Sequence, residues 1–293
     1  MSVTVRGAGS FGGNGAIAPG PTLPTGTQPG DLLILVGFVT VGATMSVTGW
    51  TQYPLSPVDD GNARKLYVFY KIASVGESAP SISVSASQWG AQILGIQVGT
   101  YDPFNPFDFA NDVSGVHTPP ASGSSTVNGI TTSIANQTVL MLFSLDRDAN
   151  GGIITGYTRS ETVTEHFDNS TTSGVGGGVA AASFVKVTPG ATGTTAIAHS
   201  TADPHWIVVG LNDEVPVVVE SQLPVEVVAT GTPAGRLTQE PVEVLAVGSP
   251  AARLTQEAVE VVARGTPQAR MSQVVVEVIR RVSHENVQID LID

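Results

Sequence analysis

The chain has 293 residues, no cysteine and a formal net charge of −12, and only 13% of its residues are charged. The lack of cysteine excludes cysteine-ligated zinc and thiol catalysis, and the negative charge disfavours nucleic-acid binding. The N-terminus lacks a basic segment followed by an apolar one, and the longest apolar run, around Leu32–Val39, is too short to span a bilayer. We therefore expect a soluble protein without a cleaved signal or membrane insertion.

The first motif along the chain is Gly7-Ala8-Gly9-Ser10-Phe11-Gly12, which matches the dinucleotide-binding pattern G-x-G-x-x-G. That pattern binds a pyrophosphate only where a strand leads into a helix. The next residues, 13–21, contain three glycines and two prolines, so no helix can begin there. We interpret the motif as a glycine-rich surface loop between two strands, and Asp31 as the residue that enters the following strand.

Residues 1–215 are expected to form an all-β domain, because β-branched residues suit sheets and glycine suits the turns between strands. Clusters of Gly, Pro, Asn, Asp and Ser separate ten predicted strands: Ser2–Arg6, Asp31–Thr40, Met45–Thr48, Lys65–Ala73, Ser81–Ala86, Ala91–Val98, Gln137–Leu145, Thr158–Glu165, Gly177–Val187 and His205–Leu211. Their number and spacing predict a jelly-roll-like β-sandwich.

The strand around residues 65–71 shows the expected alternation of side chains. Leu66, Val68 and Tyr70 should face one side, and Tyr67 and Phe69 the other.

An aromatic loop follows the predicted strand Ala91–Val98. It reads Tyr101-Asp102-Pro103-Phe104-Asn105-Pro106-Phe107-Asp108-Phe109. Tyr101, Phe104 and Phe107 are candidates for contact with a glycan or another partner, because aromatic rings stack on sugars and anchor interfaces. The alternative is that these rings close one end of the sandwich core.

Residues 146–153 match the first eight positions of a calcium-binding loop, and the candidate ligands are Asp146, Asp148 and Asn150. The twelfth position is Tyr157 instead of a bidentate glutamate, so an acidic hairpin turn is the alternative interpretation. No other cofactor is expected.

The remaining polar residues do not predict a catalytic site. The five histidines lack the spacing of a zinc site, and carboxylate pairs such as Asp59 and Asp60 lie in loop-like stretches. A glycosidase would need two carboxylates, but no such pair stands out from the other acidic residues.

The second region, residues 216–293, contains no aromatic residue and repeats itself every 17 residues. Each copy carries Ser/Thr-Gln followed by Val-Glu-Val, with copies beginning at Ser221, Thr238, Thr255 and Ser272. A Gly-x-Pro turn and an arginine recur between copies, which predicts two short strands in each unit.

A unit this small cannot bury enough apolar surface to offset the entropy of ordering its chain. We therefore expect other chains to hold the repeats, either as symmetric copies, most plausibly in a homotrimer, or by docking on a larger assembly, with packing on the first domain as the alternative. The predicted oligomerisation residues are the paired valines of the four copies: Val225, Val227, Val242, Val244, Val259, Val261, Val276 and Val278.

Several blocks together resemble a known family. They are Pro29-Gly30-Asp31-Leu32-Leu33-Ile34-Leu35, Gly49-Trp50-Thr51, residues 66–73 with Gly76-Glu77, and residues 98–108. Their order and spacing across residues 1–212 resemble a β-sandwich domain common in tailed-bacteriophage structural proteins. The Val-Glu-Val repeats are similar to segments of phage fibre and tail-associated proteins.

The resemblance implies a virion component, made in the host cytoplasm, that contacts other virion proteins and catalyses no reaction. Known fibre proteins attach by the N-terminus, whereas the globular domain comes first here, so either end could meet the virion. We expect a fibre, spike or decoration protein. The alternatives are a carbohydrate-binding adhesin that uses the aromatic loop, and a depolymerase with unidentified catalytic residues.

Overall fold

The computed structural model describes residues 3–13, 20–59, 61, 64–85, 88–116, 123–145, 154–171, 176–199 and 204–213. The chain divides into two units, Met1–Val215 and Pro216–Asp293. All of the described residues belong to the first unit. The predicted repeats and their eight valines lie outside the described residues, so their role in oligomerisation stays a prediction.

The described part of the chain contains strands, turns and loops and no helix, which confirms the all-β prediction. The strands are β1 Val5–Ala8, β2 Gly12–Gly13, β3 Leu32–Thr40, β4 Met45–Val47, β5 Thr51–Gln52, β6 Val58–Asp59, β7 Arg64–Ile72, β8 Ile82–Val84, β9 Trp89–Ile96, β10 Val113–Val116, β11 Gly123–Val127, β12 Thr131–Thr132, β13 Gln137–Leu145, β14 Ile154–Thr158, β15 Thr164–Thr171, β16 Gly177–Lys186, β17 Gly190–Ala191, β18 Thr195–His199 and β19 His205–Leu211.

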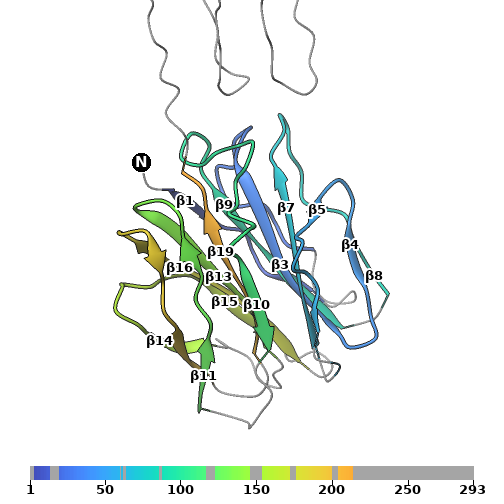
Figure 1. Cartoon of the computed structure of the whole chain (residues 1–293). Helices are drawn as coiled ribbons and strands as arrows, with labels where there is room; N and C mark the ends of the chain where they lie inside the picture. Colours follow the sequence, from blue (N-terminus) through green and yellow to red (C-terminus); the bar gives the residue numbers. More distant parts are fainter. Residues whose placement is uncertain are drawn as a thin grey trace, which may run out of the picture. The chain divides into compact units, whose positions relative to one another are not determined.

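Two antiparallel sheets form the centre of the unit (Figure 1). The first has the order β1-β9-β3-β7-β5, with β2 paired to β9 and β6 to β7, and the second has the order β10-β19-β13-β16-β15. Their inner faces share one hydrophobic core, to which β3 contributes Ile34, β9 Leu94, β13 Leu142 and β19 Val209. The two central sheets therefore pack as a β-sandwich.

Smaller sheets cover the outer faces of both central sheets. The pair β4-β8 covers Leu35 and Ile93 of the first sheet with Met45 and Val47. The three-stranded sheet β11-β18-β14 covers the second sheet, where Ile197 belongs to the same cluster as Met141, Phe143 and Val208. In Figure 1 the two outer sheets lie on opposite sides of the sandwich.

This layering explains the uninterrupted apolar runs of the central strands. A sheet that faces water on one side alternates apolar and polar residues, whereas a strand covered on both sides is apolar throughout. The central strands β13 and β19 are buried at every position, and β3 at all but its last. The alternation predicted in β7 is also confirmed, because Leu66 and Val68 face the inner core and Tyr67 and Phe69 the outer one.

The prediction of one strand over Thr158–Glu165 is wrong. The structure has two strands, β14 and β15, on either side of a turn at residues 159–163. They belong to different sheets, β14 to the outer sheet and β15 to the central one. The prediction of a jelly roll is not confirmed. Each of the two central sheets is instead built from strands of one half of the first unit.

The two halves of this unit follow the same topology. Replacing β1, β9, β3, β7 and β5 by β10, β19, β13, β16 and β15 converts the order of the first central sheet into that of the second. The outer pair β4-β8 likewise corresponds to β14-β18. Both outer pairs are antiparallel, with Ile82 opposite Val47 in β4-β8 and Ile197 opposite Tyr157 in β14-β18. The unit is thus a topological repeat whose two copies face each other across one core.

Candidate functional site

The aromatic loop connects the two halves of the first unit, between β9 and β10. Its backbone is hydrogen-bonded to the end of β19: the Asp102 N–H donates to the Asn212 carbonyl at 3.0 Å and the Asp108 N–H to the Gly210 carbonyl at 2.8 Å. The Asn212 N–H donates back to the Pro106 carbonyl at 3.0 Å. These bonds fix the loop on the sandwich, so its side chains have defined positions.

The structure places the three predicted contact residues of this loop differently. Tyr101 and Phe107 are each 1% exposed and belong to the inner core, and the Tyr101 hydroxyl donates to the Gly30 carbonyl at 2.6 Å. A buried ring cannot stack on a glycan, so the prediction of surface contact is wrong for these two residues. They close one end of the core, as the alternative interpretation stated. Phe104 is 58% exposed and remains a candidate contact residue.

Four aromatic rings meet beneath the loop. The Phe107 ring lies 5.2 Å from Tyr53 and 5.0 Å from Tyr70, both in edge-to-face arrangements. Phe109 completes the group at 5.4 Å from Phe107 and 5.5 Å from Tyr53. Its ring is 41% exposed, so Phe109 joins the buried rings to the protein surface.

A carboxylate pair adjoins these rings. The Tyr53 hydroxyl donates to one oxygen of Asp112, and the Gly210 N–H donates to the other at 2.9 Å. Asp108 lies on the same segment, where its side chain accepts hydrogen bonds from Asn111 at 3.0 Å and from the Ser133 hydroxyl at 3.1 Å. We call Tyr53, Tyr70, Phe107, Phe109, Asp108 and Asp112 the aromatic–acidic cluster.

Burial changes the pKa values of two groups in this cluster. Removal from water, together with the negative charge of Asp108, raises the pKa of Asp112 to about 7, although hydrogen bonds from Tyr53 and Gly210 act in the opposite direction. Burial also raises the pKa of the Tyr53 hydroxyl, which keeps it a hydrogen-bond donor. The net effect favours the protonated form of Asp112 relative to an exposed aspartate.

Sequence reasoning missed most of this cluster. Tyr53 and Asp112 are far apart in the chain, and no motif links an isolated tyrosine to an isolated aspartate. The available signal was the density of aromatic residues between Tyr101 and Phe109, which located the loop without showing which rings are buried.

A buried ion pair supports the other end of the same loop. Asp31 is fully buried, and it accepts hydrogen bonds from Arg6 Nε at 2.5 Å and Arg6 Nη2 at 2.8 Å. Its carboxylate also accepts the N–H groups of Gln28 at 2.8 Å and Val98 at 2.9 Å. Burial alone would raise the pKa of Asp31, but these hydrogen bonds outweigh it and lower the pKa. Asp31 does enter β3, and it also joins three segments of chain.

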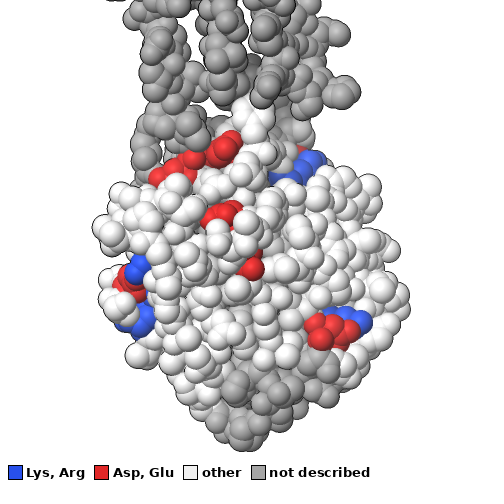
Figure 2. All heavy atoms as spheres, in the orientation of Figure 1, with Lys and Arg blue, Asp and Glu red and all other residues white. Residues whose placement is uncertain are grey.

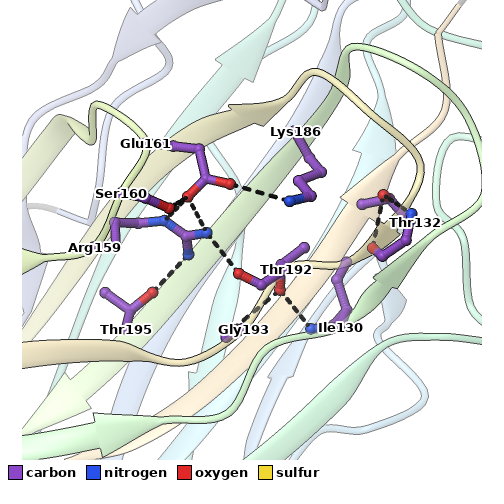
Figure 3. A network of polar contacts seen from close by, with 10 residues as sticks. Ile130, Thr132, Arg159, Ser160, Glu161, Lys186, Thr192, Gly193 and Thr195 are labelled. Atoms are coloured by element: carbon purple, nitrogen blue, oxygen red, sulfur yellow. Dashed lines mark hydrogen bonds and ion pairs between the residues drawn. The ribbon is translucent and has the colours of Figure 1, made fainter.

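A second polar network lies on the other half of the unit (Figure 3). The Arg159 guanidinium lies over the Phe184 ring at 3.3 Å and donates to the Thr195 hydroxyl at 2.7 Å and the Thr192 carbonyl at 3.0 Å. Glu161 accepts from Arg159 Nη2 at 2.8 Å and lies 3.4 Å from Lys186 Nζ. The hydrogen bond from the Ser160 hydroxyl, followed by those from Arg159, lowers the pKa of Glu161 to about 2.

This network joins the turn after β14 to β16 and to the segment before β18. The side chains of Arg159 and Lys186 donate to acceptors within the network. The network therefore stabilises the contact between these segments.

Two serine–histidine contacts have the distance expected of a nucleophile and its base. The Ser125 hydroxyl lies 2.7 Å from His199 Nε2, and the Ser183 hydroxyl lies 2.8 Å from His166 Nε2. Ser125 is 2% exposed and His199 5%, and Ser183 is 8% exposed. The first contact links β11 to β18 and the second links β15 to β16, so both join neighbouring strands.

The glycine motif at the N-terminus has a packing role. It runs from the end of β1 to the start of β2, so it joins two strands as the sequence predicted, but Gly9 within it and the adjacent Gly13 are buried rather than on the surface. A Cβ at Gly9 would lie 1.8 Å from the Thr22 carbonyl oxygen, and one at Gly13 would lie 2.4 Å from that of Trp89. Close approach of backbone segments thus requires these glycines.

The candidate metal ligands Asp146, Asp148 and Asn150 lie outside the described residues, so the calcium prediction remains open. Within the described ranges no group of three or more acidic, histidine or cysteine residues could hold a metal ion. The same residues include no helix that could cross a membrane. In the view of Figure 2 the described surface is mostly uncharged, with a few separate acidic and basic groups.

Comparison of the chain with protein-family models, with curated proteins and with solved structures found no match.

Proposed function

We propose that the protein is a non-enzymatic structural component of a tailed-bacteriophage virion, as a fibre, spike or decoration protein on the particle surface. The observation that carries this proposal is the 17-residue Val-Glu-Val repeat, which follows a β-sandwich unit. The resemblance of residues 1–212 to phage structural domains supports the same assignment. Its function would be mechanical and adhesive.

The packing of the first unit supports an assembly role for the repeats. Both faces of both central sheets are already covered by described residues of that unit. The repeats are therefore not needed to complete its core, while their own composition offers no aromatic side chain for a separate one. We propose that they associate with copies of themselves as a homotrimer, through strand pairing and valine burial.

The mass of the full chain in solution tests this proposal. Light scattering at micromolar concentration should give a trimer. A full-length variant with Val225, Val242, Val259 and Val276 changed to serine should give a monomer that keeps the β-sheet circular dichroism signal of the first unit. A monomeric wild-type chain at this concentration would refute assembly through the repeats.

A carbohydrate-binding role is the second candidate, and it would be compatible with a receptor-binding fibre. The observation in its favour is the exposure of Phe104 and Phe109 on a loop whose backbone is fixed to β19. Fixed aromatic rings lose little entropy when they stack on a sugar ring.

A glycan array with the full chain tests this role. The double variant Phe104→Ala, Phe109→Ala should lose binding at least tenfold, whereas Val75→Ala should retain it. Val75 is a suitable control because it is 87% exposed and lies outside the loop. Equal binding by the wild type and both variants would exclude the loop as the contact surface.

A further inference from the structure

The exposed large apolar side chains of the described residues are unevenly distributed over the first unit. Val41 follows the last residue of β3, and Phe109 lies beside Tyr53. The other six lie at the end of the sandwich opposite to Val41, and they are Ile72, Val75, Val98, Phe104, Val185 and Val187. Single exposed apolar residues are ordinary on a protein surface, but a group at one end is typical of an interaction surface. We call these six residues the exit-end surface, because the chain leaves the unit at this end.

Strand pairing places Ile72, Val75 and Val98 at the end of the unit where β3 begins. Ile72 is the last residue of β7, and it pairs with the first residue of β3. Val75 comes shortly after Ala73, whose N–H donates to the Asp31 carbonyl at 2.8 Å. The Val98 N–H donates to the Asp31 carboxylate at 2.9 Å. All three apolar residues therefore lie near the entry to β3.

Val185, Val187 and Phe104 lie at the matching end of the second half. β16 ends beside the start of β13, which also pairs with the end of β19. The loop that carries Phe104 is hydrogen-bonded to the same end of β19, and Tyr101 in this loop donates to the Gly30 carbonyl just before β3. The two central sheets therefore end together, and Figure 1 shows β7 and β19 ending on the same side of the unit.

The charged groups beside these apolar side chains have partners within the unit. Lys71 Nζ lies 2.8 Å from Glu77 Oε1, and Asp102 accepts the N–H groups of Phe104 at 2.9 Å and Asn105 at 3.3 Å. Covering the exit-end surface would therefore remove mainly apolar groups from water, which favours association. The cores of protein interfaces are likewise poor in charged residues.

The chain leaves the unit at the same end. Tyr101 pairs with Asp213, which follows β19, and seven residues separate Asp213 from Ser221, where the first Val-Glu-Val repeat begins. A segment of that length spans at most about 30 Å. Chains that associate through the repeats would therefore hold their exit-end surfaces near one another, at an effective concentration on the order of 1 mM.

The size of the exit-end surface favours such a tethered partner. An interface that is stable without a tether uses about 20–30 residues on each side, whereas this surface has six large apolar residues. It is therefore too small to hold a partner that arrives from solution. A weak contact is sufficient between copies that are already joined elsewhere.

We propose that the exit-end surfaces of the three copies pack against one another in the assembled protein, so that the partner of this surface is a second copy of the first unit. The inference rests on the proposed association of the repeats. It adds that the first units also contact one another, and that Phe104 is then covered instead of being presented to a glycan.

Thiol labelling tests this contact, because the chain has no cysteine of its own. Val75→Cys introduces a thiol on the exit-end surface, and Val41→Cys introduces one at the opposite end. Both side chains are exposed, so both variants should fold. The rate of reaction with a bulky maleimide is measured for each thiol in the full chain and in the full chain that also carries the four valine-to-serine changes in the repeats.

The expected protection follows from the tether. A contact with a Kd of about 0.1 mM, between copies at an effective concentration of about 1 mM, is closed for about nine-tenths of the time. The thiol of Val75→Cys should therefore react about tenfold more slowly in the full chain than in the serine variant, whereas that of Val41→Cys should react equally in both. Adding Val187→Asp should restore fast labelling of Val75→Cys without changing the trimeric mass, because burying the new charge costs free energy.

A short bis-maleimide distinguishes a second copy from any other cover. It should join Val75→Cys chains into dimers on a denaturing gel, while Val41→Cys chains should stay single. Slow labelling without such dimers would contradict the proposal. Equal slowing at Val41→Cys would indicate crowding within the trimer and would contradict it too.

Light scattering on the same samples separates this inference from the proposed function. A trimer in which Val75→Cys reacts as fast as in the serine variant would overturn the contact between first units and leave assembly through the repeats standing. The surface would then be free for a glycan or another virion protein. A monomeric full chain would refute the assembly and this contact together.

Discussion

Single side chains at the ends of loops make many of the hydrogen bonds that join segments of this unit. Asp31 and Asp112 both accept two kinds of hydrogen bond, from a side chain and from backbone N–H groups. Burial raises the pKa of both groups, but at Asp31 the hydrogen bonds from Arg6 and from backbone N–H groups outweigh it, whereas at Asp112 the hydrogen bonds do not. Two similar carboxyl groups are thus adjusted in opposite directions by their neighbours.

Loss of the Asp31 charge should destabilise the fold strongly. Asp31→Asn leaves the Arg6 guanidinium without its counter-charge, and we expect a loss of about 3 kcal/mol in the free energy of unfolding, measured by urea denaturation at pH 7. Lys186→Met, which removes a more exposed ion pair with Glu161, should cost less than about 1 kcal/mol. Equal losses in the two variants would contradict the argument.

The same pair predicts a dependence on acid. The pKa of Asp31 is lower in the folded chain than its ordinary value of 3.8. Its contribution to stability is therefore present above about pH 4 and is lost as the pH falls through the folded-state pKa. The difference in unfolding free energy between wild type and Asp31→Asn should shrink over this range.

Strands with continuous apolar sequence could be predicted well, and the short or polar ones could not. The bounds of Gln137–Leu145 and His205–Leu211 are the same in prediction and structure. Burial on both faces gives such strands a strong sequence signal. Strands such as β11, which reads GSSTV, and β18 lie in an outer sheet with one face open, and their small polar residues resemble a loop.

The candidate site was less predictable than the fold. The sequence located the aromatic loop, but the exposure of each ring depends on contacts with Tyr53, Tyr70 and the end of β19, which are distant in the chain. Neither period nor spacing encodes such contacts. The same limit explains why the sequence predicts a strand through the turn at Arg159: the partners of Arg159, Phe184 and Thr195, come from other elements.

Glycines between β1 and β3 allow segments of backbone to approach closely. Gly9→Ala would bring a methyl group to 1.8 Å from the Thr22 carbonyl oxygen, and the backbone must move to relieve the clash. We expect a loss of about 3 kcal/mol in unfolding free energy by thermal or urea denaturation. Gly20→Ala is the matched control, since nothing lies within 4 Å of its Cβ position, and its effect should stay within about 0.5 kcal/mol.

The whole unit is a topological repeat whose halves share one core. Ile34 of the first half and Leu142 of the second belong to the same inner cluster. Neither half can keep its inner face dry without the other. The halves should therefore unfold together, although each has its own central and outer sheet.

Core variants and tryptophan fluorescence test this cooperativity. Ile34→Ala and Leu142→Ala should each lower stability by about 2–5 kcal/mol in a single transition. Trp50 and Trp89 report on the first half and Trp206 on the second, so variants that keep only one set of reporters should give coincident unfolding curves. Separate transitions for the two halves would show that the shared core does not couple them.

The place of β19 has a mechanical consequence. The chain continues beyond residue 213 directly from β19, which is a central strand paired along its length with β13 and also with β10. Tension applied to β19 along its own axis would load its hydrogen bonds together in shear rather than break them one after another. The unit should accordingly resist traction at this end better than at its N-terminus, where the short strand β1 lies at the edge of its sheet.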